Sequence, residues 1–182
     1  PPDRDDVLNI LRPGDILTHC FRPFPNAPVD GQGSIRESVR KARERGVYFD
    51  LGHGAGSLSF KVSRQMLEQN FLPDTISSDV HQVSINGPAF DNLVTMSKFL
   101  CLGMPLNQVI CASTATPAKA IGRTDLGTLE VGAQGDAVVL NIEDGEFEYH
   151  DVTGDTFTGK QRLVAEKVVL QGEIWHEQGS GQ

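Results

Sequence analysis

The sequence has 182 residues, 38% of them hydrophobic, and a formal net charge of −8, so it has room for about one ordinary domain or one and a half. The acidic balance argues against a nucleic-acid binder, which needs clustered Lys and Arg, and no apolar run is long enough to span a membrane. No signal-peptide pattern is visible and Cys20, Cys101 and Cys111 lie in apolar surroundings typical of reduced thiols, so we expect a cytoplasmic protein.

The first part of the chain predicts short buried strands that alternate with helices. We expect helices over residues 7–11, 34–45 and 61–70, and strands over residues 15–21, 47–51 and 75–81. Ser34 and Glu37 match a capping box, which makes Ser34 the expected N-cap of the second helix. Residues 57–60 fit either a short strand or the approach to a helix. The alternation of strands and helices indicates an α/β protein with parallel strands.

The second part changes character after about residue 125. Three further helices are expected over residues 90–102, 106–112 and 116–122. Short strands punctuated by glycine follow over residues 137–142, 147–150, 162–170 and 173–176, with turns at Asp144-Gly145 and Gln171-Gly172 and a loop over 151–160. We therefore divide the chain into residues 1–125, which are α/β, and residues 126–182, which form a small β region.

One histidine stands out because glycines surround it. Residues 47–51 read as a buried strand that leads directly into Gly52-His53-Gly54-Ala55-Gly56-Ser57. Ser57 stands where a dinucleotide-binding fingerprint needs its last glycine, and no phosphate-binding Lys-Ser/Thr pair follows. A flexible turn with an incidental histidine is the competing interpretation.

Three predicted strands end on residues that can bind metal: His19, His53 and Asp79. They are separated by 34 and 26 residues, and a barrel of about 250 residues uses roughly 31 for each βα unit. Two imidazoles and a carboxylate are a common ligand set for catalytic Zn²⁺, and an aspartate beside a metal-bound water can act as its general base. Each residue also has a plainer interpretation, as a hydrogen-bonded structural histidine or as a helix cap. Asp50 and His81 are weaker candidates: Asp50 is expected to pair or cap nearby.

In their order along the chain, these motifs resemble the C-terminal portion of the amidohydrolase superfamily, nearest to its dihydroorotase-like deacetylase branch. The matching pieces are residues 14–21, 50–57, 76–81, 116–118 and 126–137. The resemblance implies the C-terminal half of a (β/α)₈ TIM-type barrel followed by part of a small β-sandwich. It also implies one or two divalent metals, usually zinc, with His19, His53 and Asp79 as ligands and Asp79 moving the proton. The implied reaction is hydrolysis of an amide or ester bond in a small molecule, with specificity in the loops 21–33 and 80–89.

The chain lacks two features that the superfamily takes from earlier strands. It contains no H-x-H pair, and Lys61 follows the second histidine, so we do not assign it the role of a bridging carboxylated lysine. We therefore expect a fragment of a longer chain, or a chain that is completed by a second polypeptide with the N-terminal half or by a copy of itself. Two hypotheses stay open: part of a zinc-dependent amidohydrolase, and a non-catalytic half-barrel that functions by assembly.

Overall fold

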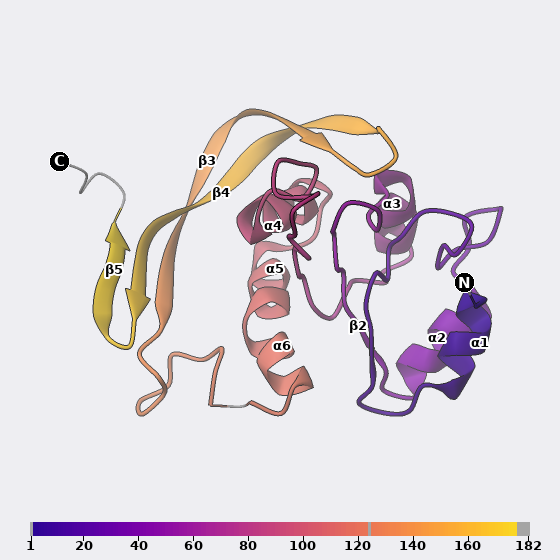
Figure 1. Ribbon diagram of the computed structural model, residues 1–182, viewed down its shortest axis with the longest axis horizontal. Helices are drawn as coiled ribbons and strands as arrows, with labels where there is room; N and C mark the ends of the chain where they lie inside the picture. The colour runs from indigo at the N-terminus through magenta and orange to yellow at the C-terminus, as the bar shows by residue number, and fades with distance from the viewer. Residues whose placement is uncertain (1, 124, 178–182) are drawn as a thin grey trace.

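The computed structural model describes residues 2–123 and 125–177 (Figure 1). Its helices are α1 (Arg4–Ile10), α2 (Glu37–Glu44), α3 (Phe60–Glu68), α4 (Asn92–Cys101), α5 (Leu106–Ser113) and α6 (Ala115–Ala120). Its strands are β1 (Ile16–Leu17), β2 (Tyr48–Phe49), β3 (Ala137–His150), β4 (Thr156–Leu170) and β5 (Glu173–Glu177). In the part of the chain that is described, no helix combines the length and hydropathy needed to cross a membrane.

The three strands predicted in the first part lie side by side and run in the same direction. β1 pairs with β2 in parallel, Ile16 opposite Tyr48, and a parallel bridge joins Asp50 to Thr75. The regular strands are shorter than predicted, because the backbone enters the left-handed region at His19 (φ 59°) and Gly52 (φ 52°). Their carboxyl ends therefore meet at one edge, where chemistry is commonly located in α/β folds.

The start of α2 differs from its prediction, and the start of α3 decides between two interpretations that the sequence left open. Ser34 is not the N-cap of α2: the helix begins at Glu37 after Arg36, whose side chain makes no capping hydrogen bond. An antiparallel bridge between Val29 and Ile35 keeps Ser34 in an extended turn instead, which rules out the capping geometry. Residues 57–60 are the approach to a helix, since the Ser59 side chain accepts a hydrogen bond from Val62 N at the start of α3.

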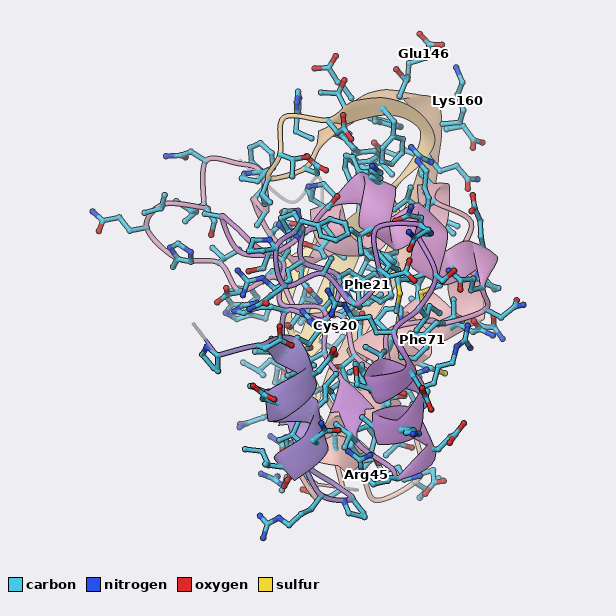
Figure 2. The ribbon with its side chains drawn as sticks, turned by 90° about the vertical axis from the view of Figure 1, so that its right-hand side faces the viewer. Cys20, Phe21, Arg45, Phe71, Glu146 and Lys160 are labelled. Carbon is cyan, nitrogen blue, oxygen red and sulfur yellow. The ribbon has the colours of Figure 1, made fainter. Side chains whose placement is uncertain are left out.

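Aromatic side chains fill the space between the parallel segments and the helices. Phe21, Phe49 and Phe99 are fully buried, and the ring of Phe49 meets that of Phe71 edge to face at 5.2 Å. Figure 2 shows Cys20, Phe21 and Phe71 inside the molecule. Such packing gives the short parallel segments the support that two-residue strands cannot give themselves.

The C-terminal part differs from its prediction. The turn expected at Asp144-Gly145 is wrong: β3 continues through it, with a register shift between Asp144 and Phe147, so the glycine marks a bulge. Residues 156–160, expected in a loop, belong to β4, which pairs with β3 along almost its whole length. The turn predicted at Gln171-Gly172 is confirmed between β4 and β5.

The long β3–β4 hairpin arches over α3 and α4 (Figure 1). Its buried residues Tyr149 and Leu163 belong to the same hydrophobic cluster as the α/β core. The backbone N–H of Leu163 donates to the Ser97 hydroxyl on α4, and that of Val152 donates to the carbonyl of Leu58. The hairpin is thus attached to α4 and, at its tip, to the segment that leads into α3.

Candidate functional site

One carboxylate holds the three strand ends together. Asp50 accepts hydrogen bonds from Thr18 Oγ1 at 2.7 Å, Thr75 Oγ1 at 2.6 Å and Ser77 Oγ at 2.8 Å. Ser77 Oγ in turn accepts from the backbone N–H of Gly52. Asp50 pairs with its neighbours, as the sequence led us to expect, and it fixes the edge on which the candidate ligands lie.

His19 has the geometry of a metal ligand. Its Nδ1 atom lies 2.8 Å from the carbonyl oxygen of Gly52, and its Nε2 atom has no hydrogen-bond partner within the described residues. Metal-binding histidines commonly donate their second nitrogen to a backbone carbonyl in this way, which fixes the ring and leaves the other nitrogen for the metal. The half-buried ring of His19 therefore fits the predicted role.

Asp79 lies on the other side of the glycine segment. Asp79 is exposed, and its backbone lies in the left-handed region (φ 47°). Within residues 2–123 and 125–177 its carboxylate accepts no hydrogen bond. A Cβ atom on Gly54 would lie only 2.5 Å from Asp79 Oδ2, and one on Gly52 would lie 2.6 Å from His19 Nδ1. A side chain at either position would force His19 or Asp79 to shift, and both glycines have a left-handed backbone (φ 52°), which favours glycine.

His53 is placed differently from the other two. Its side chain is fully buried, with Nδ1 2.9 Å from the Gly54 carbonyl oxygen and Nε2 2.8 Å from the Nζ atom of Lys98. Burial and the neighbouring charge of Lys98 lower the pKa of His53 to about 4, so the ring is neutral at physiological pH.

Lys98 is the functional candidate that the sequence analysis missed. It is 1% exposed, and its Nζ atom donates to the carbonyls of Pro88 at 2.6 Å and His150 at 2.8 Å as well as contacting His53. Burial lowers the pKa of Lys98 to about 7, against the opposing effect of the Asp151 carboxylate. The available signal was a lone lysine within the apolar stretch of the helix expected over residues 90–102.

The three predicted ligands are not assembled into one set. Among the described residues, no group of three or more His, Cys, Asp and Glu side chains is close enough to hold a metal ion. The chemistry and placement of His19 and Asp79 fit a divalent cation, whereas both ring nitrogens of His53 already have partners. His81, the weaker candidate, is exposed and accepts a hydrogen bond from Val83 N.

Comparisons with known proteins agree on one family. The model of the Amidohydrolase family matches residues 61–175. A deacetylase of Brucella anthropi is 37% identical over 151 residues, which are 83% of this chain and 38% of the relative. A crystal structure of an adenine deaminase superposes with a TM-score of 0.93 at 32% identity, covering 97% of this chain and 49% of that one. A crystal structure of a dihydroorotase gives 0.82 at 36% identity, covering 93% and 46%. The chain thus spans half or less of the length of these three proteins.

Proposed function

Since the chain belongs to the amidohydrolase family, we propose that it forms part of a metal-dependent, dihydroorotase-like hydrolase. This enzyme would cleave a C–N amide bond, or a related ester bond, in a small molecule. Residues 1–125 would supply the C-terminal half of its (β/α)₈ barrel and residues 126–182 part of a small β-sandwich. Support comes from the three adjacent parallel segments and from similarity to proteins named deacetylase, adenine deaminase and dihydroorotase.

The observation that carries the proposal is the position of His19 and Asp79 on either side of the glycine segment. In the proposed site these two residues and His53 bind one or two divalent metals, most simply Zn²⁺. Bound metal supplies an activated hydroxide and polarises the carbonyl of the substrate. His53 would hold the metal through Nε2, the atom that lies 2.8 Å from Lys98 Nζ in this structure.

Asp79 is the proposed general acid and base. Its carboxylate is exposed and free of hydrogen bonds within the described part of the chain, so it can accept a proton from the attacking water and deliver it to the leaving nitrogen. The loops 21–33 and 80–89 flank this edge and are the proposed determinants of which amide is accepted.

The test is the variant Asp79→Asn in the natural polypeptide that contains these residues. We expect kcat on a panel of N-acetyl amino acids, cyclic amides and aryl acetates to fall by about 10²- to 10⁴-fold, the usual contribution of a general acid or base. The matched control is Asp6→Asn, an exposed residue of α1 outside the site. Equal activity in the two variants would disprove the role of Asp79.

A second candidate function is favoured by the incomplete ligand set. The chain spans at most about half of each protein reported above, and its described residues hold no three-ligand cluster. It could therefore be a non-catalytic half-barrel that is completed by a complementing N-terminal half or by a second copy. The mass and zinc content of the purified chain distinguish the two: a metal-free, inactive monomer supports this candidate, and a zinc-loaded, active homo-oligomer excludes it.

A further inference from the structure

Arg22 is the one arginine of the described residues whose side chain neither donates a hydrogen bond nor lies over an aromatic ring. Every other arginine there does one or the other. The Nε atom of Arg22 is buried and has no acceptor in this part of the chain. A buried donor without an acceptor costs free energy, so an acceptor supplied by a ligand would stabilise this side chain.

We propose that Arg22 is a specificity-determining residue that binds a carboxylate of the substrate through its guanidinium. The inference rests on the proposed function, because it adds a negatively charged group to the small-molecule amide that the site would hydrolyse. A guanidinium and a carboxylate match in geometry, since two parallel N–H groups can donate to the two oxygens. The substrate is then an amide with a free carboxylate close to the bond that is cleaved.

The backbone of Arg22 is fixed beside His19, the first candidate ligand. Its N–H group donates to the carbonyl of His19 at 3.4 Å, which closes a turn directly after the strand end. The preceding residue, Phe21, is fully buried, and its carbonyl accepts from Ser59 N at 3.2 Å, in the segment that follows the glycine-flanked histidine. Arg22 therefore lies at the start of the loop 21–33, next to the edge that carries the candidate ligands.

The charges at this turn favour an anion. The carbonyl of His19 that accepts from Arg22 N also accepts from Arg4 Nη2 at 3.0 Å, so a second guanidinium meets the same turn. Neither guanidinium forms an ion pair within the described residues, although the chain has a net charge of −8. Two like charges without a counter-ion repel each other, and an anion bound at Arg22 would offset this repulsion.

The first experiment compares a charged and a neutral substrate in the natural polypeptide that contains these residues. The pair is the N-acetyl amino acid that it hydrolyses fastest and the methylamide of that compound, which lacks the charge. For Arg22→Met we expect KM to rise about tenfold or more for the acid, with kcat little changed, and to stay the same for the methylamide. Arg22→Lys keeps the charge without the two parallel donors and should give an intermediate KM. Arg40→Met, at an exposed position of α2, is the control.

The second experiment measures binding without turnover, by calorimetric titration of the Asp79→Asn variant with N-acetylglycine. Adding Arg22→Met should weaken binding about tenfold or more, whereas adding Arg40→Met should not. If the wild type hydrolyses no N-acetyl amino acid but this difference is found, the proposed hydrolysis fails and the carboxylate site stands. Equal affinity with and without Arg22→Met, or binding to neither protein, overturns the role of Arg22.

Stability distinguishes a ligand-binding arginine from a structural one. Arg22→Met removes a buried donor that has no acceptor in the described part of the chain, so its thermal unfolding temperature should be no lower than that of Arg40→Met. A marked loss of stability in Arg22→Met alone would show that the guanidinium binds an acceptor elsewhere in the natural polypeptide, which overturns the ligand-binding role.

Discussion

Arg4 reaches from α1 to the residue that carries the first candidate ligand: its Nη2 atom donates to the backbone carbonyl of His19 at 3.0 Å. The same guanidinium donates to the carbonyls of Cys20 at 3.3 Å and Asn26 at 2.7 Å and is 6% exposed. A buried charge is tolerated when it is hydrogen-bonded, and each of the three guanidinium nitrogens of Arg4 has a carbonyl acceptor. The helix thereby holds the left-handed backbone of His19 in place.

Replacing Arg4 by Met should lower the free energy of unfolding by about 3 kcal/mol or more, because three carbonyls lose a hydrogen bond from a charged donor and at least one of these bonds is buried. Urea unfolding of the chain followed by circular dichroism measures the change. Arg12→Met is the control, since its side chain is 83% exposed and, among the described residues, pairs only with Asp15, and it should cost less than about 1 kcal/mol. Similar losses in the two variants would show that Arg4 does not support the site.

The glycine segment offers a closely matched pair of substitutions. Gly54 has φ 52°, and its Cβ would meet Asp79 Oδ2 at 2.5 Å, whereas Gly56 lies outside the left-handed region and its Cβ would have no neighbour within 4 Å. Gly54→Ala should destabilise the chain by about 1–2 kcal/mol from backbone strain alone and displace Asp79. Gly56→Ala should be neutral or stabilise by up to about 1 kcal/mol, through the entropy of the unfolded chain.

Thermal unfolding of the two alanine variants measures the difference in their stability. A change in Zn²⁺ affinity would report the displacement of Asp79. We expect only Gly54→Ala to weaken zinc binding. A Gly54→Ala protein as stable as Gly56→Ala would mean that the segment is loose enough to move away from Asp79, which contradicts the packing described above.

Hydrophobic periodicity and glycine spacing were enough to predict the three parallel segments and the shared edge of their carboxyl ends. These features depend on local pattern and on the handedness of βα connections. The resemblance to amidohydrolases is confirmed by the match over residues 61–175. The ligand roles of His19, His53 and Asp79 stay predictions.

What the sequence could not predict depends on contacts between distant segments. Ser34 carries the chemistry of an N-cap, but the Val29–Ile35 bridge holds it elsewhere. Asp144-Gly145 reads as a turn, yet β4 pairs across it and converts it to a bulge. The contact of His53 with Lys98 joins residues 45 positions apart in the sequence. Local sequence patterns do not predict which polar side chains contact one another in the core.

Asp151 connects the tip of the β3–β4 hairpin to the start of α3. Its carboxylate is 4% exposed and accepts from the backbone N–H of Phe60 at 2.8 Å, at the start of α3, and from those of Thr153 at 2.7 Å and Asp155 at 3.0 Å. A carboxylate at a helix N-terminus also interacts favourably with the helix dipole. The Asp151 carboxylate therefore attaches the tip of the hairpin to the start of α3, beside the contacts of the Phe157 ring with Phe60 and Arg64.

Asp151→Ala should lower the free energy of unfolding by about 2–4 kcal/mol, since several backbone donors lose a charged acceptor. Hydrogen exchange should accelerate at the amides of Phe60 and Val152, because the latter bonds to Leu58 only while the tip stays in place. Asp155→Ala is the control: its side chain is exposed and makes no hydrogen bond in the described structure, so the loss should stay below about 0.5 kcal/mol. Unchanged exchange at Phe60 in Asp151→Ala would indicate that the hydrophobic contacts of Tyr149 and Leu163 hold the hairpin without the carboxylate. In that case the His150 carbonyl, which accepts a hydrogen bond from Lys98, would be positioned by packing alone.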